Sequence, residues 1–150
     1  MDKNKVIREV ELFEFLTDDI VAGLVDAAKE MKFSKGELVF HEEERAEYVY
    51  ILVEGKISMG VSLTSKPAKV TVSVLDTPYL LCGWSAIVSP YRFTAYGLCE
   101  EDTKVLAIPG ESILDLLEQN PGVAYTVMKR LTELISGRLR STRMVTLRTL

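Results

Sequence analysis

The chain has 150 residues, of which 47% are hydrophobic, and its formal net charge is −4 at pH 7. This length and composition predict one globular domain that needs no disulfide or metal to fold. The acidic charge argues against bulk nucleic-acid binding across the whole surface. The N-terminus is charged throughout and no apolar run approaches 20 residues. We therefore expect a cytoplasmic protein with no membrane partner.

The inventory of reactive side chains argues against an enzyme. His41 is the only histidine, so a Ser-His-Asp or Cys-His arrangement has no other candidate base. A cupin-type metal site would need several histidines beside a carboxylate. Cys82 and Cys99 are too few for a disulfide framework, and we expect both to be buried free thiols. We predict no catalytic residue and no metal ligand.

The first predicted elements are helices within residues 10–31. Apolar residues recur there at steps of three and four. Thr17, followed by two aspartates, is a favourable helix N-cap. The pattern therefore predicts two short helices that meet near residue 17.

The hydrophobic period changes after these helices, and residues 32–109 predict a β-roll. This segment is rich in β-branched and aromatic residues, and short turn sequences interrupt it. Residues 68–76 alternate as a half-buried strand does, and residues 94–108 predict two strands around a Glu-Glu-Asp turn. Many short strands joined by turns are typical of a compact roll. The predicted fold class is α+β, mainly β: a double-stranded β-helix of the jelly-roll type with helices at both ends.

Two helices are predicted after the roll. The first covers residues 110–120, with Ser112 as its cap, and Pro121 ends it. The second is long, amphipathic and covers residues 123–150. A helix of about 25 residues spans roughly 37 Å, which is more than a roll of this size covers. We therefore predict a homodimer through residues 123–145; the alternative is a helix packed entirely on its own roll.

Three stretches carry a family resemblance: KGELVFHEEERAEYVYILVEGKI, residues 83–95, and DTKVLAIPGESILDLLEQNP followed by RLTELISGRLRST. In this order they resemble the first glycine-containing turn, the phosphate-binding cassette, and the exit strand, hinge helix and dimer helix of cyclic-nucleotide-binding domains of the catabolite-activator and Fnr type. The resemblance implies a single domain over residues 1–150. Its parts are N-terminal helices (10–31), a β-roll (32–109), a hinge helix (110–120) and a dimer helix (123–150).

The residue types of the cassette predict a pocket for one phosphate. Gly83 permits a turn with positive φ, and a helical turn through Ser85 and Ala86 presents backbone N–H groups to an anion. Arg92 can complete the site with a fork of donors, and Thr94 can add a hydroxyl. The resemblance implies cyclic AMP or cyclic GMP as the ligand; the residues alone indicate only a small anionic ligand, and we assign no cofactor.

The cassette departs from the family pattern. Trp84 occupies the position of a glutamate that holds the ribose hydroxyl, and an indole has no acceptor. Phe93 occupies the position of the family's arginine, and Arg92 lies one residue earlier. Either an irregular loop turns Arg92 inward, or it points to solvent and aromatic side chains fill the pocket. Glu43 replaces a glycine of the first turn. Thr142 matches the position that reaches toward the nucleotide base.

We predict a regulatory, small-molecule-sensing domain with an altered cassette that signals through its C-terminal helix to an unidentified protein. The predicted ligand-binding residues are Gly83, Trp84, Ser85, Ala86, Arg92, Phe93, Thr94 and Thr142. One alternative is a docking or dimerisation module whose pocket has closed. Another is the effector domain of a transcription regulator that has lost its DNA-binding part. DNA is not an expected partner, because we identify no helix-turn-helix and a solvated helix surface explains the basic residues after residue 129.

Overall fold

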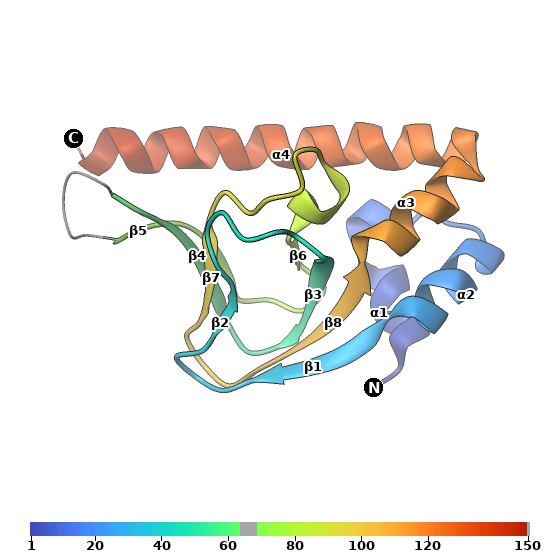
Figure 1. The fold of residues 1–150 in the computed structure, drawn as a ribbon, viewed down its shortest axis with the longest axis horizontal. Coiled ribbons are helices and arrows are strands. Elements are labelled where there is room, and N and C mark those ends of the chain that lie inside the picture. Colours follow the sequence, from blue (N-terminus) through green and yellow to red (C-terminus); the bar gives the residue numbers. More distant parts are fainter. Residues whose placement is uncertain (64–68, 150) are drawn as a thin grey trace.

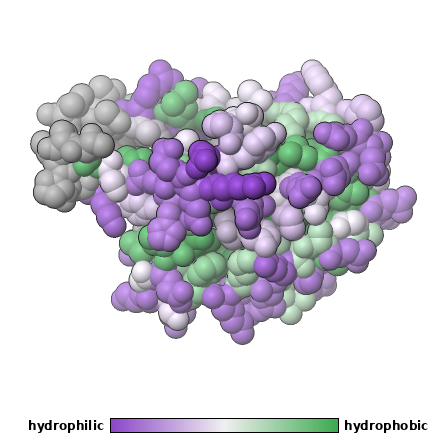
Figure 2. All heavy atoms as spheres, viewed as in Figure 1, coloured by the Kyte–Doolittle hydropathy of each residue, from purple (hydrophilic) through white to green (hydrophobic). Residues whose placement is uncertain are grey.

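The computed structural model describes residues 1–63 and 69–149, with side chains up to residue 144. Figure 1 shows a β-roll with helices gathered at one end and one long helix, α4 (Pro121–Thr149), running along the roll. Hydrophilic residues cover most of the face seen in Figure 2, and apolar residues form small separate patches there. The α+β, mainly-β fold class predicted from the sequence is confirmed.

Two four-stranded antiparallel sheets form the roll in the described part of the chain. The first sheet has the order β1 (Lys29–Phe33), β8 (Thr103–Pro109), β3 (Tyr48–Glu54) and β6 (Leu81–Cys82). The second has the order β2 (Leu38–Phe40), β7 (Tyr96–Cys99), β4 (Ile57–Ser62) and β5 (Lys69–Leu75). The strand predicted at residues 68–76 is confirmed as β5, although residue 68 lies outside the described residues. The two strands around the Glu-Glu-Asp turn are confirmed as β7 and β8.

Strand β8 shows why the core lies between the sheets and the helices. It pairs with β1 on one side and β3 on the other, and it also contacts α2 and α3. Residues Val105, Leu106, Ala107 and Ile108 are therefore all buried, because both faces of the strand are covered. The two cysteines are buried and free, as predicted.

The N-terminal helical region is displaced from its predicted range. The structure has α1 (Lys3–Glu9), a 3-10 helix η1 (Glu11–Phe13) and α2 (Asp18–Ala27). Thr17 caps α2 as predicted, since its hydroxyl oxygen accepts from the Ile20 N–H at 3.4 Å. Helix α1 was not predicted; Asp2 caps it, since its side chain accepts from the Lys5 N–H. Residues 29–31 are strand rather than helix, because they pair with β8 and tertiary pairing overrides local pattern.

The first C-terminal helix starts at residue 110, the first residue of its predicted range, and the second starts two residues earlier than predicted. Helix α3 (Gly110–Glu118) starts two residues before Ser112, so the predicted cap is wrong. The Gly110 N–H donates to the Glu47 carbonyl at 2.8 Å, which ties the helix start to the roll. Helix α4 starts at Pro121, where a missing N–H costs nothing. The predicted break between the helices is confirmed.

Candidate functional site

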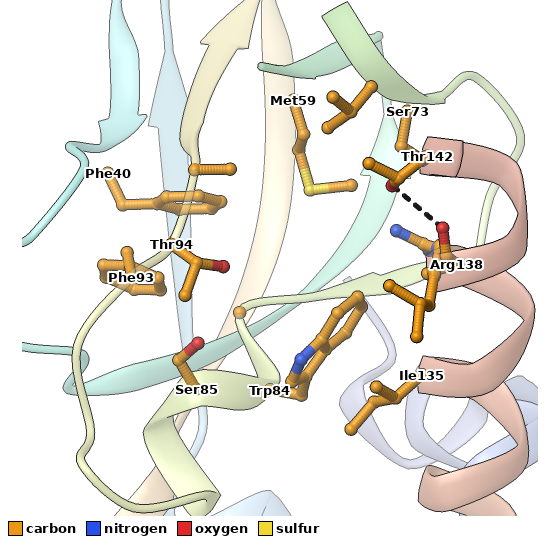
Figure 3. Close-up of a pocket in the computed structure, with 14 residues that line it drawn as sticks. Phe40, Met59, Ser73, Trp84, Ser85, Phe93, Thr94, Ile135, Arg138 and Thr142 are labelled. Carbon is orange, nitrogen blue, oxygen red and sulfur yellow. Dashed lines mark hydrogen bonds between the residues drawn. The ribbon is translucent and has the colours of Figure 1, made fainter. Parts of the chain in front are cut away.

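A cavity of about 350 Å³ lies between the roll and α4. Its described lining residues are Phe40, Met59, Val72, Ser73, Gly83, Trp84, Ser85, Phe93, Thr94, Ala95, Ile135, Arg138, Leu139 and Thr142. Figure 3 shows the residues of α4 on one side of the cavity, with Trp84 beside them and the Phe40 and Phe93 rings on the opposite side. Segments separated by nearly a hundred residues thus share one concave surface of the size usual for small-molecule sites.

The cassette has the backbone that its glycine predicts. Gly83 has a φ of +82°, and a Cβ there would lie 2.8 Å from the Tyr48 carbonyl oxygen. Only glycine accepts this combination without strain. The next four residues form one 3-10 turn, η2 (Trp84–Ile87). The predicted tight turn and helical turn are confirmed.

The side chain that enters the roll after this turn is Phe93, not Arg92. Phe93 is 4% exposed, and its ring stacks on Phe40 with centroids 4.2 Å apart. Arg92 is exposed, and its Nη1 donates to the Glu43 carbonyl at 2.8 Å. Successive residues of an extended chain point to opposite faces, so seating Phe93 inward turns Arg92 outward. The structure therefore places Arg92 outside the cavity, in the solvent-facing arrangement that the sequence left open.

The first turn keeps its backbone shape without the glycine of the family pattern. Glu43 has a φ of +64°, which is uncommon for a residue with a Cβ. Its N–H donates to the Phe93 carbonyl at 2.8 Å, and the Phe93 N–H donates to the Glu44 carbonyl at 3.0 Å. These bonds tie the first turn to the cassette, and they fix the direction of Phe93.

Six of the eight predicted ligand-binding residues line the cavity: Gly83, Trp84, Ser85, Phe93, Thr94 and Thr142. Ala86 and Arg92 instead line a second hollow of about 550 Å³, together with Arg45, Glu47 and Glu111 among others. The structure thus separates the predicted arginine from the predicted hydroxyl groups. A role in ligand binding stays a prediction for all eight.

Arg138 was not predicted, yet it lines the cavity from α4. Its Nη2 donates to the Leu81 carbonyl at 3.3 Å, and its guanidinium lies 5.2 Å from the centre of the Trp84 ring. Burial lowers the pKa of Arg138, and burial raises the pKa of the nearby Cys82 thiol to about 12. The signal was present in the sequence, because Arg138 lies three residues after Ile135 and four before Thr142, on the apolar face.

No group of three or more histidine, cysteine, aspartate or glutamate residues in the described part of the chain is arranged to hold a metal ion. No described helix combines the length and the apolar character needed to cross a membrane.

Comparison with known proteins identifies the family. Residues 30–120 match the cyclic nucleotide-binding domain family, and the chain belongs to that family. The crystal structure of a candidate cyclic nucleotide-binding protein from Geobacter metallireducens is 23% identical to this chain. Its TM-score is 0.78, over 93% of this chain and 99% of that one. The N-terminal domain of a transcriptional regulator from Streptomyces coelicolor is 26% identical, with a TM-score of 0.69 over 94% of both chains.

A curated relative shows that such a domain also occurs within a longer protein. A candidate potassium channel protein of Rhodopseudomonas palustris is 22% identical over 133 residues, which make up 89% of this chain. The chain spans 30% of that relative's length. The fold is thus that of a cyclic nucleotide-binding regulatory domain, like those of transcription regulators.

Proposed function

We propose that this domain senses a small molecule in the cavity beside α4 and transmits its binding through that helix. One observation carries the proposal: Gly83, Trp84 and Ser85 of the cassette and Arg138 and Thr142 of α4 line the same cavity. A ligand there contacts the roll and the helix at once. Its binding energy therefore depends on where the helix lies.

The mechanism is a population shift. A ligand that binds better when α4 lies against the roll favours that arrangement by its difference in affinity. Helix α3 provides a second connection, since it contacts both η2 and α4. A small displacement of the cassette would therefore reach the start of α4 as a rigid-body movement of packed helices.

The ligand that we propose is cyclic AMP, cyclic GMP or another small anionic compound. The Geobacter structure carries a cyclic nucleotide-binding name, and the shared fold supports a related ligand class here. The altered cassette argues for weak or changed nucleotide recognition, because Trp84 supplies no acceptor and Arg92 faces away. The domain would act in the cytoplasm on a downstream protein that recognises α4.

Three exposed apolar side chains of α4 support a homodimer through residues 123–145. Tyr125, Leu139 and Met144 are all at least half exposed on this helix. A second copy would cover such residues and would place two cavities beside one shared interface. Sedimentation at several protein concentrations tests this, and a strictly monomeric chain at high concentration would contradict it.

Calorimetric titration with cyclic AMP and cyclic GMP, each up to millimolar concentration, tests the sensor function. We expect saturable binding of at least one of them. No heat from either nucleotide at millimolar concentration would remove cyclic nucleotides as the ligand.

A docking module is the second candidate, and a specific observation favours it. Arg92 faces solvent and Phe93 stacks on Phe40 inside the roll. In that case the domain would dimerise and bind a partner without any ligand. A constitutive dimer whose amide exchange and unfolding midpoint do not respond to nucleotide would favour this function.

A further inference from the structure

The cavity holds one cation that lacks a counter-charge. Arg138 is the only charged residue among the described residues of its lining. No salt bridge joins it to an acidic side chain in the described ranges. Its Nη1 is buried there without a hydrogen-bond partner. Buried charges are normally paired, and a buried donor without a partner is costly. An anion bound in the cavity would therefore supply both the missing counter-charge and the missing hydrogen-bond acceptor.

The position of the guanidinium is defined by its neighbours. Nη2 donates to the Leu81 carbonyl, and the ring of Trp84 lies beside the cation at a distance suited to a cation–π contact. These two contacts hold the side chain against the cavity wall (Figure 3). Nη1 keeps its N–H donors unused, in a setting where a charged hydrogen bond is stronger than in water.

The other lining residues of the cavity indicate the chemical character of the rest of the ligand. Met59, Ile135 and the stacked Phe40–Phe93 pair give the cavity apolar surfaces. The hydroxyl groups of Ser85 and Thr94 lie on the cassette side (Figure 3). This combination suits a small organic anion with a flat apolar part, rather than a free inorganic ion.

We propose that Arg138 of α4 is the anion anchor of this cavity, in place of an arginine of the cassette. The ligand would then be a small organic anion whose charged group contacts α4 and whose apolar part faces Met59 and Phe93. This reverses the polarity implied by the sequence resemblance, which places the anion at the cassette. It rests on the proposed function in so far as the cavity is the ligand site. It also explains direct signalling, because the ligand's charge would hold α4 itself.

Trp84 provides a readout inside the cavity, because it is the only tryptophan of the chain. Quenching of its fluorescence by iodide, caesium and acrylamide at constant ionic strength compares an anion, a cation and a neutral probe. Each quenching constant is divided by that of free tryptophan, because iodide quenches indole more efficiently than caesium does. On this scale an anion anchor predicts stronger quenching by iodide than by caesium, although the net charge of −4 favours caesium. Equal quenching, or stronger quenching by caesium, would overturn the proposal without any variant.

Variants assign the effect to one residue. In R138Q we expect iodide quenching to fall about twofold or more, with acrylamide quenching unchanged. R138K keeps the charge and should retain most of the iodide effect. R140Q removes an exposed charge from the same helix, outside the cavity, and should behave as the unaltered protein does. Iodide quenching that survives in folded R138Q, or that is lost equally in R140Q, would contradict the proposal.

Ligand titration separates this inference from the proposed function. Cyclic AMP and uncharged adenosine share a base and a ribose, so their affinity ratio reports the anchor. We expect R138Q to lose about 10- to 100-fold in affinity for cyclic AMP and little for adenosine. An unchanged ratio would overturn the role of Arg138 while leaving the sensor intact. If neither compound binds, cyclic nucleotide sensing fails, and the quenching result alone decides whether Arg138 anchors an anion.

Discussion

The two halves of α4 are held in different ways. In the first half, residues 121–134, Val127 and Leu131 are 1% and 2% exposed, and this half contacts η1 and α3. In the second half, residues 135–149, Leu139 and Met144 are 56% and 50% exposed. The second half meets the roll around the cavity rather than over a packed core.

This difference indicates that the second half of α4 can move more easily than the first half. Buried apolar contacts secure the first half, so its local opening requires much of the free energy of unfolding. Among the described apolar residues of the second half, only Ile135 packs against the core, and it is partly buried. Under the proposed function, a ligand in the cavity would supply further support. The proposed signalling through α4 would use this combination of a well-packed first half and a less tightly held second half.

The largest expected contrast compares one leucine from each half. Leu131→Ala should lower the free energy of unfolding by about 2–5 kcal/mol, because it leaves a cavity in packed surroundings. Leu139→Ala should change it by less than about 0.5 kcal/mol in dilute protein, because the side chain is largely exposed. Urea unfolding at low concentration measures both. Similar losses in the two variants would show that the halves are equally packed.

A second variant tests whether α3 fixes the first half. A Cβ at Gly110 would overlap the Ala86 carbonyl, so Gly110→Ala should force α3 away from η2. We expect a loss of about 1–3 kcal/mol and faster amide exchange in residues 121–134. Gly122→Ala is the matched control, because a Cβ there meets no atom within 4 Å. If exchange in α4 is unchanged in Gly110→Ala, α3 does not hold the first half.

The pH dependence of stability tests whether water is excluded from the Cys82 thiol near Arg138. Burial raises the pKa of Cys82 from 9.0 to about 12, and burial also raises the pKa of Tyr50. The native thiol stays protonated while the unfolded thiol ionises, so stability is full below about pH 9 and is lost between pH 9 and 12. The slope per group approaches about 1.4 kcal/mol per pH unit.

Cys82→Ala separates the thiol from the tyrosine. Urea unfolding between pH 7 and 10.5 should show a shallower decline in this variant than in the unaltered chain. Equal slopes would mean that water reaches the Cys82 thiol in the folded protein.

The smallest expected effect concerns protein concentration. If the second half pairs with a second copy, its amide exchange should slow several-fold as concentration rises, because association stabilises the bound form by mass action. Exchange in residues 121–134 should change less. Exchange rates independent of concentration in both halves would remove the dimer through this helix.

A feature of the fold or the site could be predicted when neighbouring residues alone set it, and could not when it depended on contacts between distant segments. The turn at Gly83 and the cap at Thr17 follow from one or two residues and their immediate neighbours, and both were predicted. The direction of Arg92 could not be, because it depends on Phe93 stacking on Phe40, fifty-three residues earlier in the chain. Arg138 was missed because charged residues on a long helix usually face solvent, although its spacing from Ile135 and Thr142 placed it on the apolar face; its contact with Trp84 confirms that position.

By itself the sequence determined the order of helices and strands, the β-roll and the cassette turn, because hydrophobic period and glycine positions act over short distances. Tertiary structure alone decided that residues 29–31 pair with β8, that Arg92 faces solvent, and that the cavity's cation comes from α4. The physical reason is the same in each case. Pairing and burial between segments far apart in the chain outweigh local preferences that differ by only about 1 kcal/mol.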